Sequence, residues 1–270
     1  MAGPVFSMLP APSSRTHSMP LRRRFSTEKG TDLHRCLVCD IRAQSVCSAI
    51  DDTELAILAQ ASKRLTLPPG TSVVEEGSPA VAFYNVTSGT VKLFKSLPDG
   101  RRQITGFADI GHFLGLTNAE TYAFSAETVD TVQVCRFLRP QLETLLTDYP
   151  QFERRLLSEV TDELAEAQEQ MLLLGRKTAR ERVASFLLNR MLPPASPNQT
   201  ESEGCMVSLP MTRVDIADYL GLTIETVSRT ISALRREQTI TGTDNHGIRV
   251  LSVSRLTDLA SGQTSGQNNR

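Results

Sequence analysis

The sequence predicts an α+β fold in three ordered parts: an N-terminal jelly roll of β-strands, one long helix, and a C-terminal winged helix-turn-helix. Residues 81–107 and 127–137 alternate apolar and polar side chains between turn residues, which is typical of a jelly roll or sandwich. Residues 157–174 carry apolar side chains at alternating spacings of three and four. Residues 211–240 have the pattern of a helix, a glycine turn and a second helix.

The composition is that of an ordinary globular protein with two domains. The 270 residues carry a formal net charge of −1, with 40% hydrophobic and 22% charged residues. No apolar run approaches the roughly 18 residues that a membrane-spanning helix needs. Residues 1–30 are rich in Pro, Ser and Arg and lack the apolar segment of a signal peptide. We therefore expect a disordered basic tail and a cytoplasmic protein, whose five cysteines are not disulfide partners.

The jelly roll is expected to begin after a short helix and to end near Leu138. Leu55, Leu58 and Leu65 have helical spacing in residues 51–67, with Asp51 placed to cap the helix. In residues 127–137 the alternation places Val132 and Val134 on one face of a strand. Cys135 falls on the other face.

The long helix carries the narrow apolar stripe of a coiled coil. Its members are Leu157, Val160, Leu164, Ala167, Met171 and Leu174. Such a stripe indicates a helix that pairs with a second copy, although a helix packed on its own domain is the alternative. The stripe is flanked by the acidic residues Glu159, Asp162, Glu163, Glu166 and Glu169. Because like charges repel by a few tenths of a kcal/mol per close pair, the dimer is expected to be marginal.

The helix-turn-helix begins with a helix whose apolar face is expected to hold Val214, Ile216 and Ala217. Gly221 breaks this helix, and Thr223 is placed to cap the second one. The inner face of the second helix is expected to hold Val227, Ile231 and Leu234. A wing of two short strands is expected around Asn245, His246 and Gly247.

The outer face of the second helix has the chemistry of a DNA-recognition helix. If the three apolar residues face inward, Glu225, Ser228 and Arg229 project outward near the helix N-terminus, where a recognition helix meets base edges. Arg can hold guanine with two hydrogen bonds, Glu can accept from a base amino group, and Ser can serve either base. We expect the basic residues Arg213, Arg235 and Arg236 to contact phosphates.

These features together resemble the CRP/FNR superfamily of bacterial transcription regulators over residues 51–256, and "LGLTIETVSR" resembles its FNR branch. The resemblance implies a cyclic-nucleotide-binding-like jelly roll, and it places the FNR specificity residues on Glu225, Ser228 and Arg229. The cyclic-AMP branch has an extra arginine where this chain has Ile224, which favours a TTGAT-type inverted repeat as the target. The segments "QITGF" and "MLLLGRKTARERVASFL" also resemble FNR proteins.

Three thiols lie within twelve residues: Cys36, Cys39 and Cys47. Three local thiolates and a fourth from elsewhere would hold zinc or an iron–sulfur cluster. From the residues alone both stay open, as does His34 in place of a thiol. The resemblance implies Cys135 as the fourth ligand and a [4Fe-4S] cluster, because "VCRF" matches the sensor-domain cysteine of FNR proteins. The C-x₂-C-x₇-C spacing resembles the FnrN/FnrL/Anr-like branch. Cys205 stands alone in a Pro/Ser/Asn-rich segment and is interpreted as an incidental thiol.

A cyclic nucleotide is not expected as the effector. The superfamily binds the ribose with a Glu and the cyclic phosphate with an Arg-Ser pair, but this chain has His112 at the Glu position. Tyr122-Ala123-Phe124 fills the Arg-Ser region. A buried phosphate without a cation would cost heavily. His112 and His246 lack a partner pattern and are interpreted as packing or surface residues.

The expected domain organisation has six parts. It comprises a disordered basic tail (1–30), a cysteine-rich cluster-binding segment (31–50), a β-roll sensor domain (51–150), a dimerisation helix (151–176), a winged helix-turn-helix DNA-binding domain (177–256) and a disordered tail (257–270). The resemblance implies a homodimeric oxygen-responsive regulator, not an enzyme, with double-stranded DNA and RNA polymerase as partners. The alternative is an oxygen-independent dimeric DNA binder with structural zinc or no metal.

Overall fold

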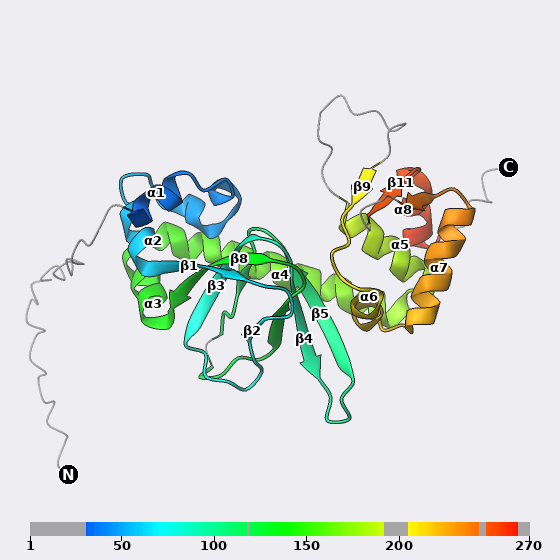
Figure 1. Cartoon of the computed structure of the whole chain (residues 1–270), viewed down its shortest axis with the longest axis horizontal. Helices are drawn as coiled ribbons and strands as arrows, with labels where there is room; N and C mark the ends of the chain where they lie inside the picture. Colours follow the sequence, from blue (N-terminus) through cyan, green and yellow to red (C-terminus); the bar gives the residue numbers. More distant parts are fainter. Residues whose placement is uncertain (1–30, 118, 192–204, 243–246, 264–270) are drawn as a thin grey trace, which may run out of the picture. The chain divides into compact units, whose positions relative to one another are not determined.

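The computed structural model describes residues 31–117, 119–191, 205–242 and 247–263. The expected basic tail over residues 1–30 and His246 lie outside these residues. Within the described ranges, no helix has both the length and the apolar character needed to cross a membrane. The fold class is confirmed: a β-sheet domain, a long helix and a helix-turn-helix domain follow one another along the chain (Figure 1).

The cysteine-rich segment forms short helical pieces. Helix α1 spans Thr31–Leu37, the 3₁₀ turns η1 and η2 span Arg42–Gln44 and Val46–Ala49, and α2 spans Leu55–Ala61. The expected helix was therefore too long and its cap was wrong. Glu54, not Asp51, precedes α2, and Leu65 lies in a strand. Long-range pairing of that strand with the last strand of the roll, absent from the local pattern, overrides the helical spacing.

The jelly roll consists of two antiparallel four-stranded sheets. The first sheet has the order β1 (Ser62–Leu67), β8 (Val132–Leu138), β3 (Ala82–Ser88) and β6 (Phe113–Leu114). The second has the order β2 (Ser72–Val74), β7 (Ser125–Thr128), β4 (Val91–Ser96) and β5 (Arg102–Ala108). The last strand ends at Leu138, as the sequence predicts.

Two hydrophobic clusters lie on the two faces of the first sheet. Val132 and Val134 belong to the cluster between the sheets, which also contains Val86 and Val91. Phe137 points to the other face and joins a second cluster, which we call the outer core. The outer core contains Val46, Ile50, Leu55, Leu58, Phe83, Phe113, Phe137, Leu142, Leu145, Tyr149, Phe152 and Leu156. The cysteine-rich segment thus packs on the outer face of the first sheet.

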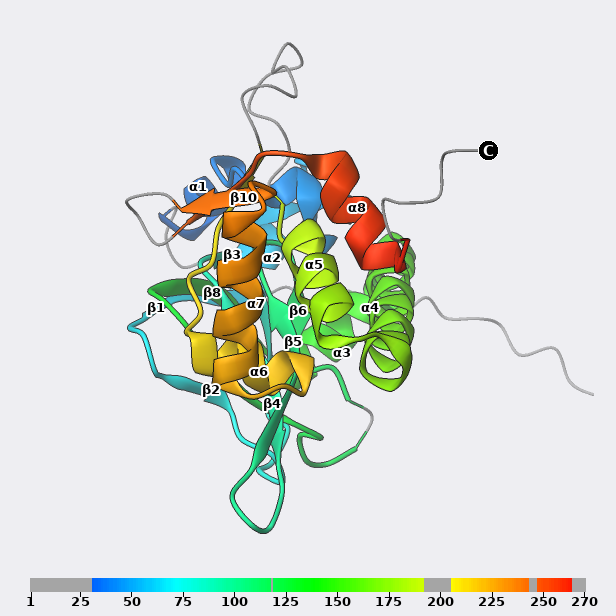
Figure 2. The same cartoon turned by 90° about the vertical axis from the view of Figure 1, so that its right-hand side faces the viewer.

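Two helices follow the roll. Helix α3 spans Arg139–Asp148, and α4 spans Pro150–Arg176 with proline at its first turn, where no donor is lost. Helix α4 runs behind the jelly roll towards the C-terminal domain (Figures 1 and 2). Its first turns bury Phe152 in the outer core, and its last turns bury Leu173 in the core of the C-terminal domain.

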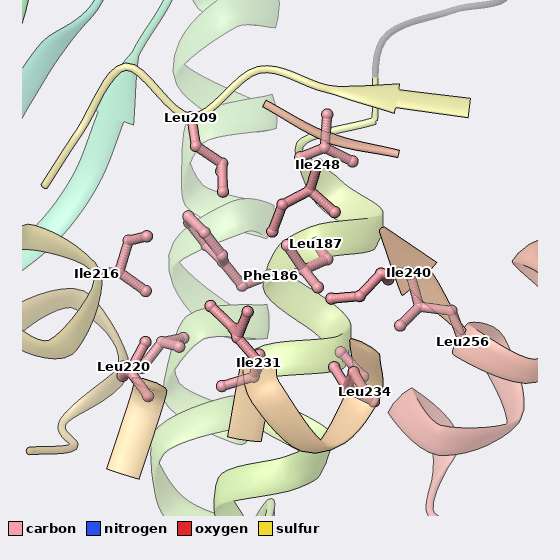
Figure 3. Packing of buried hydrophobic residues seen from close by; sticks show 14 of the residues in the cluster. Phe186, Leu187, Leu209, Ile216, Leu220, Ile231, Leu234, Ile240, Ile248 and Leu256 are labelled. Carbon is pink, nitrogen blue, oxygen red and sulfur yellow. The ribbon is translucent and has the colours of Figure 1, made fainter. Parts of the chain in front are cut away.

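The C-terminal domain is a winged helix-turn-helix. Its helices are α5 (Ala179–Asn189), α6 (Arg213–Leu220), α7 (Ile224–Arg236) and α8 (Val253–Ser261). Its sheet has the order β10 (Ile240–Gly242), β11 (Ile248–Val250) and β9 (Cys205–Val207). Phe186, Leu187, Ile216, Leu220, Ile231, Leu234 and Leu256 meet in one core (Figure 3). Gly221 ends α6 with φ 60°, a conformation that glycine adopts freely.

Two expectations about this domain were wrong in detail, and one strand was not predicted. Val214 is 43% exposed, because Ile216, Ala217 and Leu220 form the inner face of α6 instead. Cys205 begins a strand, since β9 pairs with β11 across the wing. Helix α8 continues to Ser261 and buries Ala260, so the ordered domain extends beyond residue 256.

Candidate metal centre and nucleic-acid interface

The structure brings the three clustered cysteines together with Cys135. Cys36 lies on α1, Cys39 follows that helix, Cys47 lies on η2 and Cys135 lies on β8. All four are free and partly buried, and Cys36, Cys47 and Cys135 pack against the outer core. Electrostatic repulsion from Cys135 and Cys39 contributes to raising the pKa of Cys36 and of Cys47. The four cysteines, drawn from four segments, therefore lie near one another at the outer face of the first sheet.

The first sheet positions Cys135 between two hydrogen-bond donors. In the register of the sheet, Cys135 is paired with Arg64 of β1 on one side and with Asn85 of β3 on the other. Directly paired residues point to the same face of a sheet. The Arg64 Nη2 donates to Cys39 Sγ at 3.8 Å, and the Asn85 Nδ2 donates to Cys47 Sγ at 3.9 Å. The sequence patterns did not reveal this row, because register is a long-range property.

Burial is the main influence on the pKa of three of the thiols. It raises the pKa of Cys36 and of Cys135, and it raises the pKa of Cys47 to about 12. The Arg64 guanidinium works against burial at Cys135. Metal ligands must be deprotonated, so binding at these sulfurs would release protons.

The side chains near this site that could bind a metal are four free cysteines, which suit a group bound through sulfur. Among the residues that the structure describes, no three His, Cys, Asp or Glu side chains are grouped so as to hold one metal ion. His34, the alternative ligand considered from the sequence, is exposed on α1. Four cysteines with N–H donors beside two of the sulfurs are the residues that an iron–sulfur cluster uses. Cys36, Cys39, Cys47 and Cys135 could hold it.

The thiol site is connected to the long helix by packing. The turn η2, which carries Cys47, contacts α4. Val46 and Ile50, on either side of Cys47, share the outer core with Phe152 and Leu156 of α4. A displacement of η2 would therefore disturb the first turns of α4.

Most of the expected stripe on α4 is exposed. Leu157, Val160, Leu164 and Met171 are 65%, 41%, 57% and 66% exposed, and Ala167 is exposed as well. Leu174 differs, since it is partly buried against the core of the C-terminal domain. Among the acidic flanks, Glu159 is paired with Arg155 of the preceding turn at 2.6 Å. One flanking charge is thus compensated within the helix.

Helix α7 presents the expected trio to solvent. The Thr223 Oγ1 accepts from Thr226 N at 3.1 Å and caps the helix, as predicted. Val227, Ile231 and Leu234 are buried, also as predicted. The trio Glu225, Ser228 and Arg229 is exposed. Arg229 Nη2 lies 2.5 Å from Glu225 Oε1, so the two side chains orient each other on the exposed face.

A second basic region is formed by Arg213 at the start of α6 and by Arg235 and Arg236 at the end of α7. Arg213 is partly buried, and its Nη1 has no hydrogen-bond partner among the described residues. Burial and the charge of Arg235 both lower the pKa of Arg213. Arg235 and Arg236 are exposed in the last turn of α7. An unsatisfied cationic group of this kind suits an anion such as a phosphate.

Contacts between the jelly roll and α6 were not predicted. Lys92 of β4 is 8% exposed, and its Nζ lies 3.0 Å from Asp215 Oδ1 and 2.9 Å from Glu127 Oε1. Burial alone would lower the pKa of Lys92, but the two carboxylates outweigh it and raise that pKa. Gln103 of β5 donates to Asp218 O at 2.7 Å. The strand pattern treats such polar residues as solvent-facing, so no local signal reveals them.

Tyr122 and His112, which stand at two positions of the superfamily's nucleotide site, are both engaged by the protein's own backbone. Tyr122 is 6% exposed, and its hydroxyl donates to Ala82 O at 2.7 Å and accepts from Ala82 N at 3.2 Å. His112 occupies a turn, with Nδ1 3.1 Å from Asp109 O.

A jelly roll, a long helix and a winged helix-turn-helix with an exposed Glu-Ser-Arg face define the class of transcription regulators that join a jelly-roll domain to a DNA-binding domain. The Crp-like helix-turn-helix domain model matches residues 181–259, and the cyclic nucleotide-binding domain model matches residues 64–149.

Relatives extend the match over most of the chain. The nitrogen fixation regulation protein FixK of Bradyrhizobium diazoefficiens is 42% identical over 84% of this chain and 94% of its own length. The transcriptional activator protein FnrL of Cereibacter sphaeroides is 38% identical over 88% of this chain and 97% of its own. The solved structure of FixK2 from Bradyrhizobium japonicum has a TM-score of 0.67 and 36% identity, covering 73% of this chain and 96% of that one.

The chain belongs to the CRP/FNR family of transcription regulators. It is a transcription regulator of the CRP/FNR type and not an enzyme.

Proposed function

We propose that this chain is a homodimeric regulator that senses oxygen through a [4Fe-4S] cluster held by Cys36, Cys39, Cys47 and Cys135. In this proposal it binds TTGAT-type inverted repeats and controls anaerobic or microaerobic genes. The observation that carries the proposal is the meeting of Cys135 with three cysteines about ninety residues earlier in the chain.

The hydrogen bonding around the sulfurs supports a cluster at this site. The N–H groups of Arg64 and Asn85 point at sulfurs, as donors around iron–sulfur clusters do. A bound cluster would supply sensitivity to oxygen, whereas zinc has no redox chemistry.

Side chains of this chain would relay the state of the thiol site to the dimer. When all four sulfurs are ligated, η2 is tied to β8 and keeps Val46 and Ile50 against Phe152 and Leu156 of α4. The exposed stripe then begins one residue later, at Leu157. When the ligation is lost, η2 is released and the first turns of α4 lose this support. Dimer pairing through the stripe weakens, because its acidic flanks oppose it.

The dimer would present two α7 helices to successive major grooves, so its DNA site is an inverted repeat. Arg229 would hold a guanine, with Glu225 orienting it and accepting from a neighbouring base, and Ser228 would contact the adjacent pair. Arg213, Arg235 and Arg236 would hold phosphates, and Thr223 would orient the helix start. RNA polymerase is the second partner implied by activation.

A cyclic nucleotide is not the effector in this proposal. Both hydrogen-bonding functions of the Tyr122 hydroxyl are already used by Ala82. No arginine or serine stands in residues 122–124 to hold a cyclic phosphate.

The test is an anaerobic absorbance spectrum with iron and sulfide analysis, taken before and after exposure to air. The same samples are assayed for binding to a TTGAT inverted repeat and to a scrambled control. The proposal expects iron and sulfide in the anaerobic protein, and loss of both colour and DNA affinity in air. A colourless, iron-free anaerobic protein that binds the repeat equally well in air would instead support the oxygen-independent regulator.

A further inference from the structure

The side-chain amide of Asn85 is buried but only half satisfied by hydrogen bonds. The side chain is 1% exposed at the edge of the outer core, and its Oδ1 has no hydrogen-bond partner among the described residues. A buried polar atom without a partner costs folding free energy, so an apolar residue would serve the fold better. The hydrogen bond that the structure gives this amide is the donation to Cys47 Sγ at 3.9 Å.

Arg64 is placed in the same way on the opposite side of Cys135. Its Nη2 donates to Cys39 Sγ at 3.8 Å, and its guanidinium counteracts the effect of burial on the pKa of Cys135. Its Nε is buried without a partner among the described residues. Strand pairing fixes Arg64, Cys135 and Asn85 in one row across three strands. Cys135 thus lies in the middle of the row, Arg64 at one end contacts the Cys39 sulfur, and Asn85 at the other end contacts the Cys47 sulfur.

We propose that Arg64 and Asn85 are positioning residues of the thiol site: they hold the sulfurs of Cys39 and Cys47 over Cys135 and stabilise them in the ligated, negatively charged form. This inference rests on the proposed function and adds two residues to it. N–H donors stabilise a thiolate, and the Arg64 charge adds to this effect. Groups that orient metal ligands contribute roughly 10–100-fold to metal retention.

The two residues have separate tasks within the row. Asn85 is neutral and rigidly held in the sheet, so it fixes the place of Cys47 and hence of η2. Arg64 brings the only positive charge of the row and reaches Cys39, which lies between α1 and η1. Together they tie both ends of the C-x₇-C segment to the first sheet.

The experiment uses the full-length protein, reconstituted without oxygen with iron and sulfide, and follows the loss of thiolate-to-iron absorbance under an anaerobic chelator. We expect Asn85→Leu and Arg64→Met to lose iron roughly tenfold faster than the wild type. Arg64→Lys keeps the charge and N–H donors but loses the planar fork of the guanidinium, and should lie between the wild type and Arg64→Met. The matched control is Lys63→Met, which removes an exposed cation one residue away on the opposite face of β1.

A second readout separates a positioning role from a structural one. Thermal unfolding of the metal-free protein should show Asn85→Leu at least as stable as the wild type, because the substitution removes an unsatisfied buried atom. A marked loss of metal-free stability in Asn85→Leu would assign the residue to the fold and overturn the inference.

Two other results would count against it. If the variants retain iron as long as the wild type, or if Lys63→Met releases it as fast as Arg64→Met, Arg64 and Asn85 do not position the sulfurs. If the wild-type protein itself takes up no iron, both the proposed function and this inference are wrong.

Discussion

The thiol site draws its sulfurs from α1, the turn after it, η2 and β8, whereas the recognition surface lies on α7 alone. Helix α7 is capped, packed and oriented by its own neighbourhood, so its exposed trio is ready within one protomer. The thiol site depends on segments about ninety residues apart and on the register of three strands. A signal therefore acts more easily on the composite site than on the helix that reads DNA.

The comparison implies that regulation changes how two α7 helices are presented, not how each is built. Between the two sites lie the exposed stripe of α4 and the contact of Lys92 with α6. Substitutions in these connecting parts should uncouple DNA binding from the state of the thiol site, and substitutions on α7 should leave iron binding unchanged.

The largest effect is expected from Leu164→Glu, which should weaken the dimer without changing the thiol site. Leu164 is 57% exposed at the centre of the stripe. A dimer would bury two unpaired carboxylates, one per copy, which should weaken association roughly 100-fold or more. Sedimentation analysis of the anaerobic protein measures this, together with binding to an inverted repeat. Iron content should not change.

The control for this prediction is Ser158→Glu, which adds the same charge at an exposed position off the stripe. It should leave the dimer nearly unchanged. An unaltered dimer in Leu164→Glu would show that the stripe is not the subunit interface.

Lys92→Met should have the next largest effect. It leaves the Asp215 and Glu127 carboxylates without their cation, and the Asp215 side chain is only 6% exposed. Breaking a buried pair in this way should cost about 3 kcal/mol of unfolding free energy. Denaturant unfolding measures it. Lys95→Met is the matched control on the same strand, because its pair with Glu76 is exposed and worth at most about 1 kcal/mol.

The same contact predicts a pH dependence. Burial opposes the Asp215 charge, but hydrogen bonds from Thr212 and Lys92 outweigh it and lower the pKa of Asp215 below 3.8. Its contribution to stability is complete above the ordinary carboxyl pKa and is lost as the pH falls through the lower folded-state value. The stability difference between wild type and Lys92→Met should therefore narrow in acid. A difference that is constant down to pH values below the ordinary carboxyl range would contradict this.

Arg229→Ala tests the recognition helix alone. A bidentate contact to guanine discriminates by about 1–3 kcal/mol, so affinity for the TTGAT repeat should fall while affinity for scrambled DNA changes little. Arg235→Ala is the comparison, since loss of a phosphate contact weakens both sequences alike and lowers the salt slope by about 1. Fluorescence anisotropy at several salt concentrations measures both. If Arg229→Ala and Arg235→Ala weaken binding to the repeat and to scrambled DNA in the same way, Arg229 does not recognise a base.

The smallest effect is expected from Thr223→Ala. The substitution removes the side chain that accepts from Thr226 N at 3.1 Å at the start of α7. Loss of such a cap costs about 1 kcal/mol. Thr223→Ser keeps the hydroxyl and should unfold close to the wild type, so equal destabilisation by both substitutions would argue against capping.

The sequence predicts the local features of the fold well. The buried face of α7, its cap and the exposed trio follow from helical periodicity, and the end of the roll at Leu138 follows from strand alternation. The extent of α8 and the strand at Cys205 were missed, because short elements with tertiary partners leave weak local patterns.

The thiol site could be predicted only in part. Close spacing indicates three of its cysteines, and family resemblance supplies Cys135. Arg64 and Asn85 could not be found, since a polar residue that faces a sulfur and one that faces water have the same place in a strand pattern. The contact between Lys92 and Asp215 was also missed. The two residues are 123 positions apart in the sequence, so no local pattern connects them.

The most direct measurement is the iron content of anaerobic Cys135→Ser beside that of Cys205→Ser. Cys135 faces the three clustered cysteines, whereas Cys205 lies in the wing strand β9. We expect Cys135→Ser to lose its iron together with oxygen-dependent DNA binding, and Cys205→Ser to match the wild type in both. Full iron content and intact DNA binding in Cys135→Ser would contradict a site built from all four sulfurs.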